Sequence, residues 1–133
     1  MKYLLDTNIC IYLIKKKHPE VIERLIRAGL DRVAVSAVTL AELEYGVANS
    51  SRRLEAQTAL LEFILPFEIL DFDSASASHY GNIRKELKDK GRLIGDMDML
   101  IASIAMANGL IVVTNNEREF QRIPGLKIEN WKG

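Results

Sequence analysis

Residues 95–116, GDMDMLIASIAMANGLIVVTNN, decide how the rest of the chain is interpreted. Two acids, Asp96 and Asp98, open a segment whose apolar residues recur at the spacing of one helical face. Gly109 ends this predicted helix, because glycine adopts the left-handed cap conformation without steric cost. The apolar run at 110–113 is typical of a strand that is buried on both faces. The stretch therefore predicts a helix that begins with acids, followed by a buried strand that ends in polar residues.

Short apolar runs alternate with helix-like segments along the whole chain, which predicts an α/β fold. Predicted strands cover residues 3–5, 33–35, 67–70, 110–113 and 126–128. Predicted helices cover residues 9–17, 19–29, 39–47, 51–65, the segment from Asp73 to Gly91, 96–108 and 117–122. The pattern predicts one domain over residues 1–133, with a mainly parallel sheet and helices on both of its faces. Right-handed crossovers would bring the carboxyl ends of the strands to one edge, where ligands bind in open α/β sheets.

The composition excludes several classes of protein. The 18 basic and 18 acidic residues cancel, so the net charge does not indicate a strongly basic nucleic-acid binder. The single cysteine, Cys10, cannot form an internal disulfide, which fits a reducing compartment. The apolar start of the chain is interrupted by Asp6 and Asn8, and no run approaches the ~20 apolar residues of a membrane span. We therefore expect a cytoplasmic protein that makes no membrane contact.

Several acids lie at strand ends and helix starts, and each has an ordinary structural explanation when it is considered alone. Asp6 follows the first predicted strand and could cap the next helix, although Thr7 or Asn8 would serve as well. Asp96 is placed as the cap of the helix over 96–108, and Asp98 lies in its first turn, where the helix dipole favours acids.

Two further acids belong to patterns that resemble capping boxes. Thr39 and Glu42 form a Thr-x-x-Glu box at the start of the helix over 39–47. Asn116 and Glu119 have the same spacing at the start of the last predicted helix. Considered alone, neither Glu42 nor Glu119 identifies a functional site.

Taken together, the acids indicate a metal site. The topology brings four of them to one edge of the sheet, namely Asp6, Glu42, Asp98 and Glu119. Carboxylates in one pocket raise each other's pKa, and a divalent cation relieves that repulsion. Oxygen ligands suit Mg²⁺ or Mn²⁺, whereas one cysteine and two histidines far from the acid motifs offer little for zinc.

An oxygen-lined metal site fits the hydrolysis of a phosphodiester. One or two metal ions can generate a hydroxide, hold the scissile phosphate and stabilise the leaving oxygen. The chain has neither a P-loop nor a Gly-x-Gly-x-x-Gly motif, which disfavours nucleotide hydrolysis and dinucleotide binding. Cations beside the acids could hold a polyanionic substrate, or they could form a solvated helix face: Lys15 to Lys17, Arg84, Lys85, Lys88, Lys90 and Arg92.

Four motifs in order resemble the PIN-domain ribonucleases, and most closely the VapC toxins of bacterial toxin–antitoxin pairs. They are LLDTNICIYLIK at the start, TLAELEYG from Thr39, IGDMDMLIASIA from Ile94 and LIVVTNNEREF from Leu110. The resemblance covers essentially the whole chain and its length. It implies a three-layer α/β/α PIN domain, with a mainly parallel central sheet flanked by helices, that acts as a Mg²⁺-dependent endoribonuclease in which Mn²⁺ could substitute.

The resemblance also assigns residues to the expected site. Asp6, Glu42 and Asp98 match the three most regular metal-site acids of the family and are the expected catalytic residues. Asp98, rather than Asp96, matches the usual position in the Gly-x-x-Asp pattern, so Asp96 is an additional acid that is either a ligand or a cap.

The chain departs from the family pattern after the last core strand. Many PIN domains carry a further Asp there, whereas this chain has Asn115 and Asn116. Glu119 or Asn116 would fill that role, which leaves the number of metal ions open. Thr7 and Thr114 would orient the carboxylates by hydrogen bonds.

Partners follow from the same resemblance. VapC-like toxins cut structured RNA on which translation depends, often a tRNA anticodon stem-loop, and initiator tRNA is the substrate we expect. A VapB-like antitoxin would silence the enzyme by laying its C-terminal tail over the site. We also expect a homodimer and larger toxin–antitoxin complexes.

Three other functions fit parts of the sequence less well. The main alternative is a non-catalytic PIN-like module that binds RNA or protein, and the intact set of acids argues against it. A DNA-directed nuclease of related fold would be expected to carry a long insertion, which is absent. A phosphatase that used Asp6 as its nucleophile would need a second Asp two residues later, where Asn8 stands.

Overall fold

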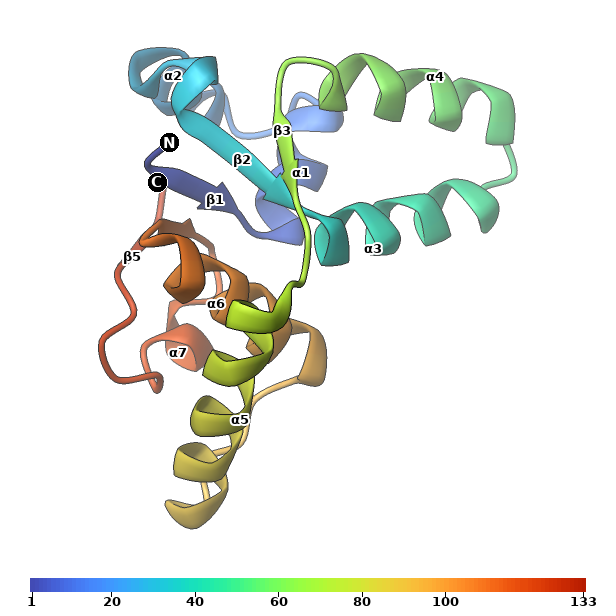
Figure 1. Ribbon diagram of the computed structural model, residues 1–133. Helices are drawn as coiled ribbons and strands as arrows, with labels where there is room; N and C mark the ends of the chain where they lie inside the picture. Colours follow the sequence, from blue (N-terminus) through green and yellow to red (C-terminus); the bar gives the residue numbers. More distant parts are fainter.

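Five strands form one sheet in which every strand runs in the same direction (Figure 1). The structure is a computed structural model that describes residues 1–133. The strand order is β3-β2-β1-β4-β5. The strands are β1 (Tyr3–Leu5), β2 (Val33–Ser36), β3 (Glu68–Leu70), β4 (Ile111–Val113) and β5 (Ile128–Glu129). The α/β class is confirmed, and the sheet is parallel throughout rather than mainly parallel.

Seven α-helices connect and cover the strands. They are α1 (Thr7–Ile14), α2 (Pro19–Ala28), α3 (Ala37–Ala48), α4 (Arg53–Ile64), α5 (Ser74–Asp89), α6 (Asp96–Asn108) and α7 (Glu117–Phe120). A short 3₁₀ turn, Leu30–Arg32, precedes β2. In Figure 1, α3 and α4 form a hairpin that extends to one side, and α5 points away from the sheet on another. No helix has the length and apolar character needed to cross a membrane.

The sheet is buried on both faces, which makes three layers. Alternate residues along each strand point to opposite faces. Leu4, Ala34 and Val112 belong to one buried cluster, together with residues of α5, α6 and α7. Tyr3, Leu5, Val33, Val35 and Val113 belong to a second cluster with residues of α1 to α4. The strands have continuous apolar runs because the side chains on both faces of the sheet are excluded from water.

Several helix boundaries differ from the predictions because side-chain caps act earlier than expected. Helix α1 begins at Thr7 rather than at residue 9, since the Asp6 carboxylate accepts a hydrogen bond from the Thr7 N–H. Helix α3 begins at Ala37 rather than Thr39, because the Ser36 hydroxyl accepts from the Thr39 N–H at 3.0 Å. Each helix therefore starts directly after its strand, with no intervening loop.

Helix α4 also differs from the prediction. It covers Arg53–Ile64 rather than 51–65, and the apolar side chains of Leu54, Leu61 and Leu65 in the predicted segment are 83%, 57% and 84% exposed. Only Leu60 is buried within this helix. The reason is that α4 packs mainly against α3 and α1, at the edge of the molecule, so its outer side has no layer above it.

Candidate active site

Asp6 is buried at the carboxyl end of β1, where its side chain is fixed from two sides. One carboxylate oxygen, Oδ1, accepts from the Thr7 N–H at 2.7 Å, and Oδ2 accepts from the Thr114 hydroxyl at 2.8 Å. The side chain is therefore both the cap of α1 and a bridge to the end of β4. Burial raises the pKa of Asp6, and repulsion from Glu42 and Glu119 adds to the rise against the opposing hydrogen bonds.

Glu42 is held by a residue of α1 rather than by the start of its own helix. The predicted capping box with Thr39 is wrong, because α3 begins two residues earlier and Ser36 supplies the cap. The Thr7 hydroxyl donates to Glu42 Oε1 at 2.6 Å and lies 3.1 Å from the Thr39 hydroxyl. The half-buried Glu42 thereby faces the end of β1.

The two acids at the start of α6 have different environments. Asp96 is the first helical residue and is exposed, and the predicted cap position belongs to Gly95. Asp98 is half-buried. Burial raises the pKa of Asp98 to about 7, and its hydrogen bond with Glu119 and repulsion from Asp6 act in the same direction. The geometry thus places Asp98 with the other acids and leaves Asp96 outside.

Glu119 joins the cluster from α7. The Asn116 amide donates to Glu119 Oε2 at 3.0 Å. The predicted box is wrong in its mechanism, because the Asn116 side chain makes no capping bond to the helix. The hydrogen bond from Asp98 holds the pKa of Glu119 below its ordinary value, and the bond from Asn116 also lowers it. The two acids thus influence each other in opposite directions, with the pKa of Asp98 raised and that of Glu119 lowered.

The four acids form a negative cluster in which only Glu119 feels a nearby basic side chain, Arg122. They come from β1, α3, α6 and α7, and they act on one another electrostatically. None of them belongs to any of the four ion pairs in the chain. No three of the Asp, Glu, His and Cys side chains are arranged closely enough to enclose a metal ion as they stand. The donor chemistry nevertheless fits a divalent cation, since all the groups are oxygen donors. Burial raises the pKa of Asp6 and of Asp98, and repulsion from the neighbouring acids adds to the rise.

The turn after β4 connects three members of the cluster. The Thr114 hydroxyl donates to Asp6 and accepts from the Asn116 N–H at 2.8 Å. The Asn116 side-chain amide in turn donates a hydrogen bond to Glu119. The predicted supporting residues are thus in contact with the acids, except Asn115, whose amide donates instead to the Tyr12 hydroxyl at 3.2 Å. No local pattern pointed to Tyr12, because 103 residues separate it from its partner.

Some of the basic residues near the end of α5 form ion pairs with acids of the same segment. Lys85 pairs with Asp89 at 2.7 Å, and Lys90 pairs with Glu86 at 3.2 Å. Both pairs are solvent-exposed. This part of the run is a solvated helix face, which was the alternative interpretation of the sequence.

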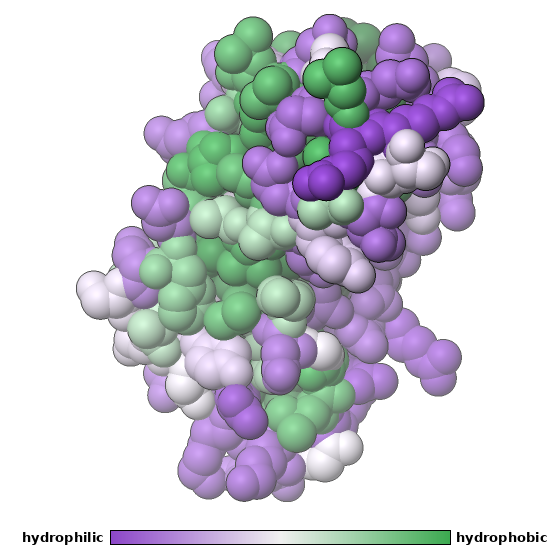
Figure 2. Space-filling model, turned by 90° about the vertical axis from the view of Figure 1, so that its right-hand side faces the viewer, coloured by the Kyte–Doolittle hydropathy of each residue, from purple (hydrophilic) through white to green (hydrophobic).

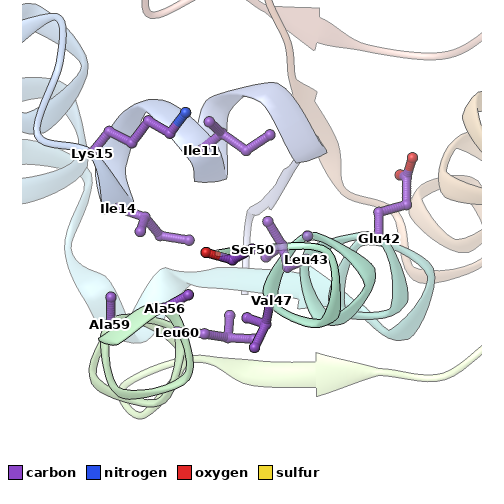
Figure 3. Close-up of a pocket in the computed structure, with 11 residues that line it drawn as sticks. Ile11, Ile14, Lys15, Glu42, Leu43, Val47, Ser50, Ala56, Ala59 and Leu60 are labelled. Carbon is purple, nitrogen blue, oxygen red and sulfur yellow. The ribbon is translucent and has the colours of Figure 1, made fainter. Parts of the chain in front are cut away.

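A largely apolar pocket of about 410 Å³ lies between α1, α3 and α4 (Figure 3). Ile11, Ile14, Leu43 and Val47 contribute to its walls. Glu42 and Lys15 lie toward opposite ends of the labelled row of side chains in Figure 3. The pocket is therefore continuous with the acid cluster through one shared residue, Glu42.

Comparison with known proteins gives consistent matches over the whole chain. The PIN domain family model matches residues 3–126. The chain is 46% identical over 132 residues to the tRNA(fMet)-specific endonuclease VapC of Shigella flexneri, and 48% identical over 132 residues to the protein of the same name from Salmonella typhimurium. It is 45% identical over 133 residues to ribonuclease VapC2 of Rickettsia felis. Each alignment covers 98% of both chains.

Solved structures agree with these sequence matches. The DNA-bound VapBC from Salmonella typhimurium superimposes with a TM-score of 0.94 at 44% identity, covering 98% of both chains. VapBC2 from Rickettsia felis, bound to a DNA fragment from its promoter, superimposes with a TM-score of 0.93 at 42% identity, covering 99% of this chain and 100% of the other. The three-layer arrangement predicted from the motifs is thus the arrangement of these proteins.

Proposed function

The chain belongs to the PIN-domain family, among the VapC ribonucleases, and from this membership we propose that it is the toxin of a VapBC-type pair that cuts tRNA. The observation that carries the proposal is the cluster of four acids at the carboxyl edge of the sheet. Relatives at 46% and 48% identity are named for action on tRNA(fMet), so initiator tRNA is the proposed substrate and its anticodon stem-loop the proposed site. Residues 1–133 would act as a single PIN domain.

PIN-domain nucleases use divalent metal ions, and Mg²⁺ is the proposed cofactor here, with Mn²⁺ as a substitute. Asp6, Glu42 and Asp98 would hold the ion, and Glu119 would complete the set. When bound, the ion would activate water and stabilise the charge that develops on the phosphate. The chain's own contribution is orientation: Thr114 fixes Asp6, Thr7 fixes Glu42, and Asn116 fixes Glu119.

RNA cleavage by the purified protein tests the proposal directly. We would incubate it with total bacterial RNA and Mg²⁺ and map new 5′ ends, with EDTA and Asp6→Ala as controls. Initiator tRNA and elongator methionine tRNA would then be compared as isolated transcripts. One discrete cut that both controls abolish is the expected result. Intact RNA with folded, antitoxin-free protein would favour the binding module over the enzyme.

Thr7→Val tests the orientation of Glu42. Valine keeps the shape of threonine but removes the hydroxyl that donates to Glu42. We expect kcat/KM for RNA cleavage to fall by about tenfold, because a hydrogen bond to a charged group contributes ~1.5–3 kcal/mol. The matched control is Thr58→Val on α4, which removes an exposed hydroxyl bond to the Leu54 carbonyl. Equal activity of the two variants would show that Thr7 does not position Glu42.

The proposed antitoxin would bind along the α3–α4 hairpin. Apolar side chains gather on this side of the molecule in Figure 2, and Leu54, Leu61 and Leu65 are among the exposed ones. The apolar pocket is lined by the other face of α4 and ends at Glu42, so a segment bound there lies next to the acids. The solved relatives are VapBC complexes, which supports an antitoxin as the occupant. A homodimer within a larger complex is part of the proposal, and the cytoplasm, where tRNA is located, is its proposed place of action.

Ala56→Glu tests this docking site. Ala56 lines the pocket, and a carboxylate there would meet the apolar side of a bound segment. We expect the affinity for a VapB-like antitoxin to fall by about 100-fold, since burying an unpaired charge costs several kcal/mol. Ser78→Glu, at an exposed position of α5 outside the hairpin, is the control and should bind normally. Titration calorimetry measures both, and RNA cleavage should be unchanged in each.

A further inference from the structure

We infer that Asn130, which follows the last strand, is a positioning residue of the acid cluster and acts through the turn after β4. This inference rests on the proposed function, since it concerns the same site. Asn130 touches none of the four acids. It is instead hydrogen-bonded to Asn115 and Glu117, the residues on either side of Asn116. The same turn makes the bonds that hold two of the acids, since Asn116 donates to Glu119 and Thr114 donates to Asp6.

The turn that positions the acids receives little support from the sheet. The ladder between β4 and β5 ends with the pairing of Val113 and Glu129, and the last backbone bond runs from the Thr114 N–H to the Glu129 carbonyl. Helix α7, which follows the turn, has only four residues. The backbone bonds of residues 115–117 run only forward into α7, so their placement against the sheet depends on bonds made by side chains.

Asn130 makes those bonds from the far side of the turn. Its amide donates to Glu117 Oε1 at 2.9 Å and to Asn115 Oδ1 at 3.4 Å. The Asn115 amide then donates to the Tyr12 hydroxyl on α1. The turn is thus held between the segment after β5 on one side and α1 on the other. Because Asp6 caps α1, the support from Tyr12 leads back to one of the acids.

The segment that carries Asn130 is itself firmly anchored. Trp131 is 3% exposed and packs edge-on against Tyr3 with ring centroids 5.3 Å apart. The Trp131 indole donates to Glu129, which also pairs with Arg24 at 2.9 Å. The side-chain oxygen of Asn130, Oδ1, accepts from the Lys132 backbone N–H at 2.9 Å, which fixes the orientation of the side-chain amide. Because its segment is anchored, the Asn130 side chain limits the movement of residues 115–117.

Two substitutions separate positioning from folding. Asn130→Ala removes the whole amide, whereas Asn130→Asp keeps the shape and the bond from Lys132 but loses the donors to the turn. Asn108→Ala is the matched control, because it removes one amide bond to a helix carbonyl at the end of α6, at the opposite edge of the sheet. Melting temperatures of all three identify any variant that is merely unfolded.

The readouts are the kinetics of RNA cleavage and the binding of Mn²⁺ without RNA, measured by electron paramagnetic resonance. For both Asn130 variants we expect kcat to fall about tenfold with KM unchanged, and Mn²⁺ to bind more weakly by a similar factor, as for other outer partners of metal ligands. Asn108→Ala should match the wild type in both. Wild-type Mn²⁺ binding and kcat in a folded Asn130→Asp protein would overturn the inference, as would equal losses in the control.

A double-mutant cycle with Tyr12→Phe tests the route of the effect. Tyr12 and Asn130 both act through Asn115, so their effects on Mn²⁺ binding should be non-additive. Additive effects would overturn the proposed route. If the wild-type protein cuts no RNA, the proposed function fails, but the Mn²⁺ measurements on the same variants still decide the role of Asn130.

Discussion

Asp98→Asn is expected to abolish RNA cleavage, by at least about 1,000-fold, while the protein becomes more stable in the absence of metal. The loss follows because a metal ion supplies several kcal/mol of charge stabilisation and each ~1.4 kcal/mol is tenfold in rate. The gain follows because burial raises the pKa of the half-buried Asp98 to about 7, and the hydrogen bond with Glu119 and repulsion from the neighbouring acids add to the rise. Cleavage assays and thermal unfolding in EDTA measure the two effects.

The pH dependence of this stability gain has a definite sign. The folded state holds the Asp98 proton more tightly than the unfolded chain does, because the pKa of Asp98 is raised. The wild-type protein should therefore lose stability as the pH rises from about 4, the ordinary aspartate value, to about 7. Asp98→Asn should lack this loss, so its advantage is largest above pH 7.

Asp96→Asn provides the matched control. It makes the same substitution in the same first turn of α6, but at an exposed position outside the cluster. We expect near wild-type cleavage and no gain of stability in EDTA. If Asp96→Asn were inactive and Asp98→Asn active, the two acids would have been assigned in the wrong order.

Removal of divalent cations is expected to abolish cleavage completely, and Mg²⁺ or Mn²⁺ should restore it. Added metal should also raise the melting temperature of the wild-type protein, because a ligand that binds only the folded state stabilises it by about 2.7 kcal/mol at 100 times its Kd. The rise should be much smaller in Asp98→Asn. Cleavage that persists in EDTA with dialysed protein would contradict a metal-dependent mechanism.

Calcium, Mg²⁺ and Mn²⁺ can be compared in the same thermal assay to separate binding from catalysis. A cation that raises the melting temperature but does not support cleavage occupies the cluster without the geometry that the reaction needs. A smaller cation prefers a strict octahedral arrangement of oxygen ligands, whereas Ca²⁺ accepts a looser and larger set. The four acids are not pre-arranged to hold an ion, so some rearrangement on binding is expected.

The order of strands and helices could be predicted from the sequence because the signals are local. Apolar runs gave all five strands to within a few residues, and Pro19 and Gly109 marked a helix start and a helix end correctly. The predicted caps failed at Thr39 and Asp96. At Thr39 the Ser36 hydroxyl, one turn earlier, caps the helix first, and propensity alone does not rank the two residues. At Asp96 the cap position falls one residue earlier than expected, on Gly95, and no side chain caps the helix.

The acids of the cluster were also predictable, since each lies next to a recognisable strand end or helix start. The hydrogen-bond partners of these acids were harder to predict. The bond between Thr7 and Glu42 spans 35 residues, and that between Thr114 and Asp6 spans 108. Thr7 and Thr114 were expected from the resemblance, but nothing local pointed to Tyr12 or Asn130. Their roles depend on the order in which the strands are placed side by side.

The central position of β1 has a consequence for when activity begins during synthesis. β1 pairs with β4, which is made more than a hundred residues later, and Asp6 needs Thr114 before its carboxylate is fixed. At ribosomal rates of about 5–20 residues per second, the two halves of the cluster are separated by roughly ten seconds. A growing chain that already contains Asp6 and Glu42 therefore still lacks the rest of the proposed catalytic centre. We expect a toxin with this strand order to be harmless to its own ribosome until the last strands have been translated and folded.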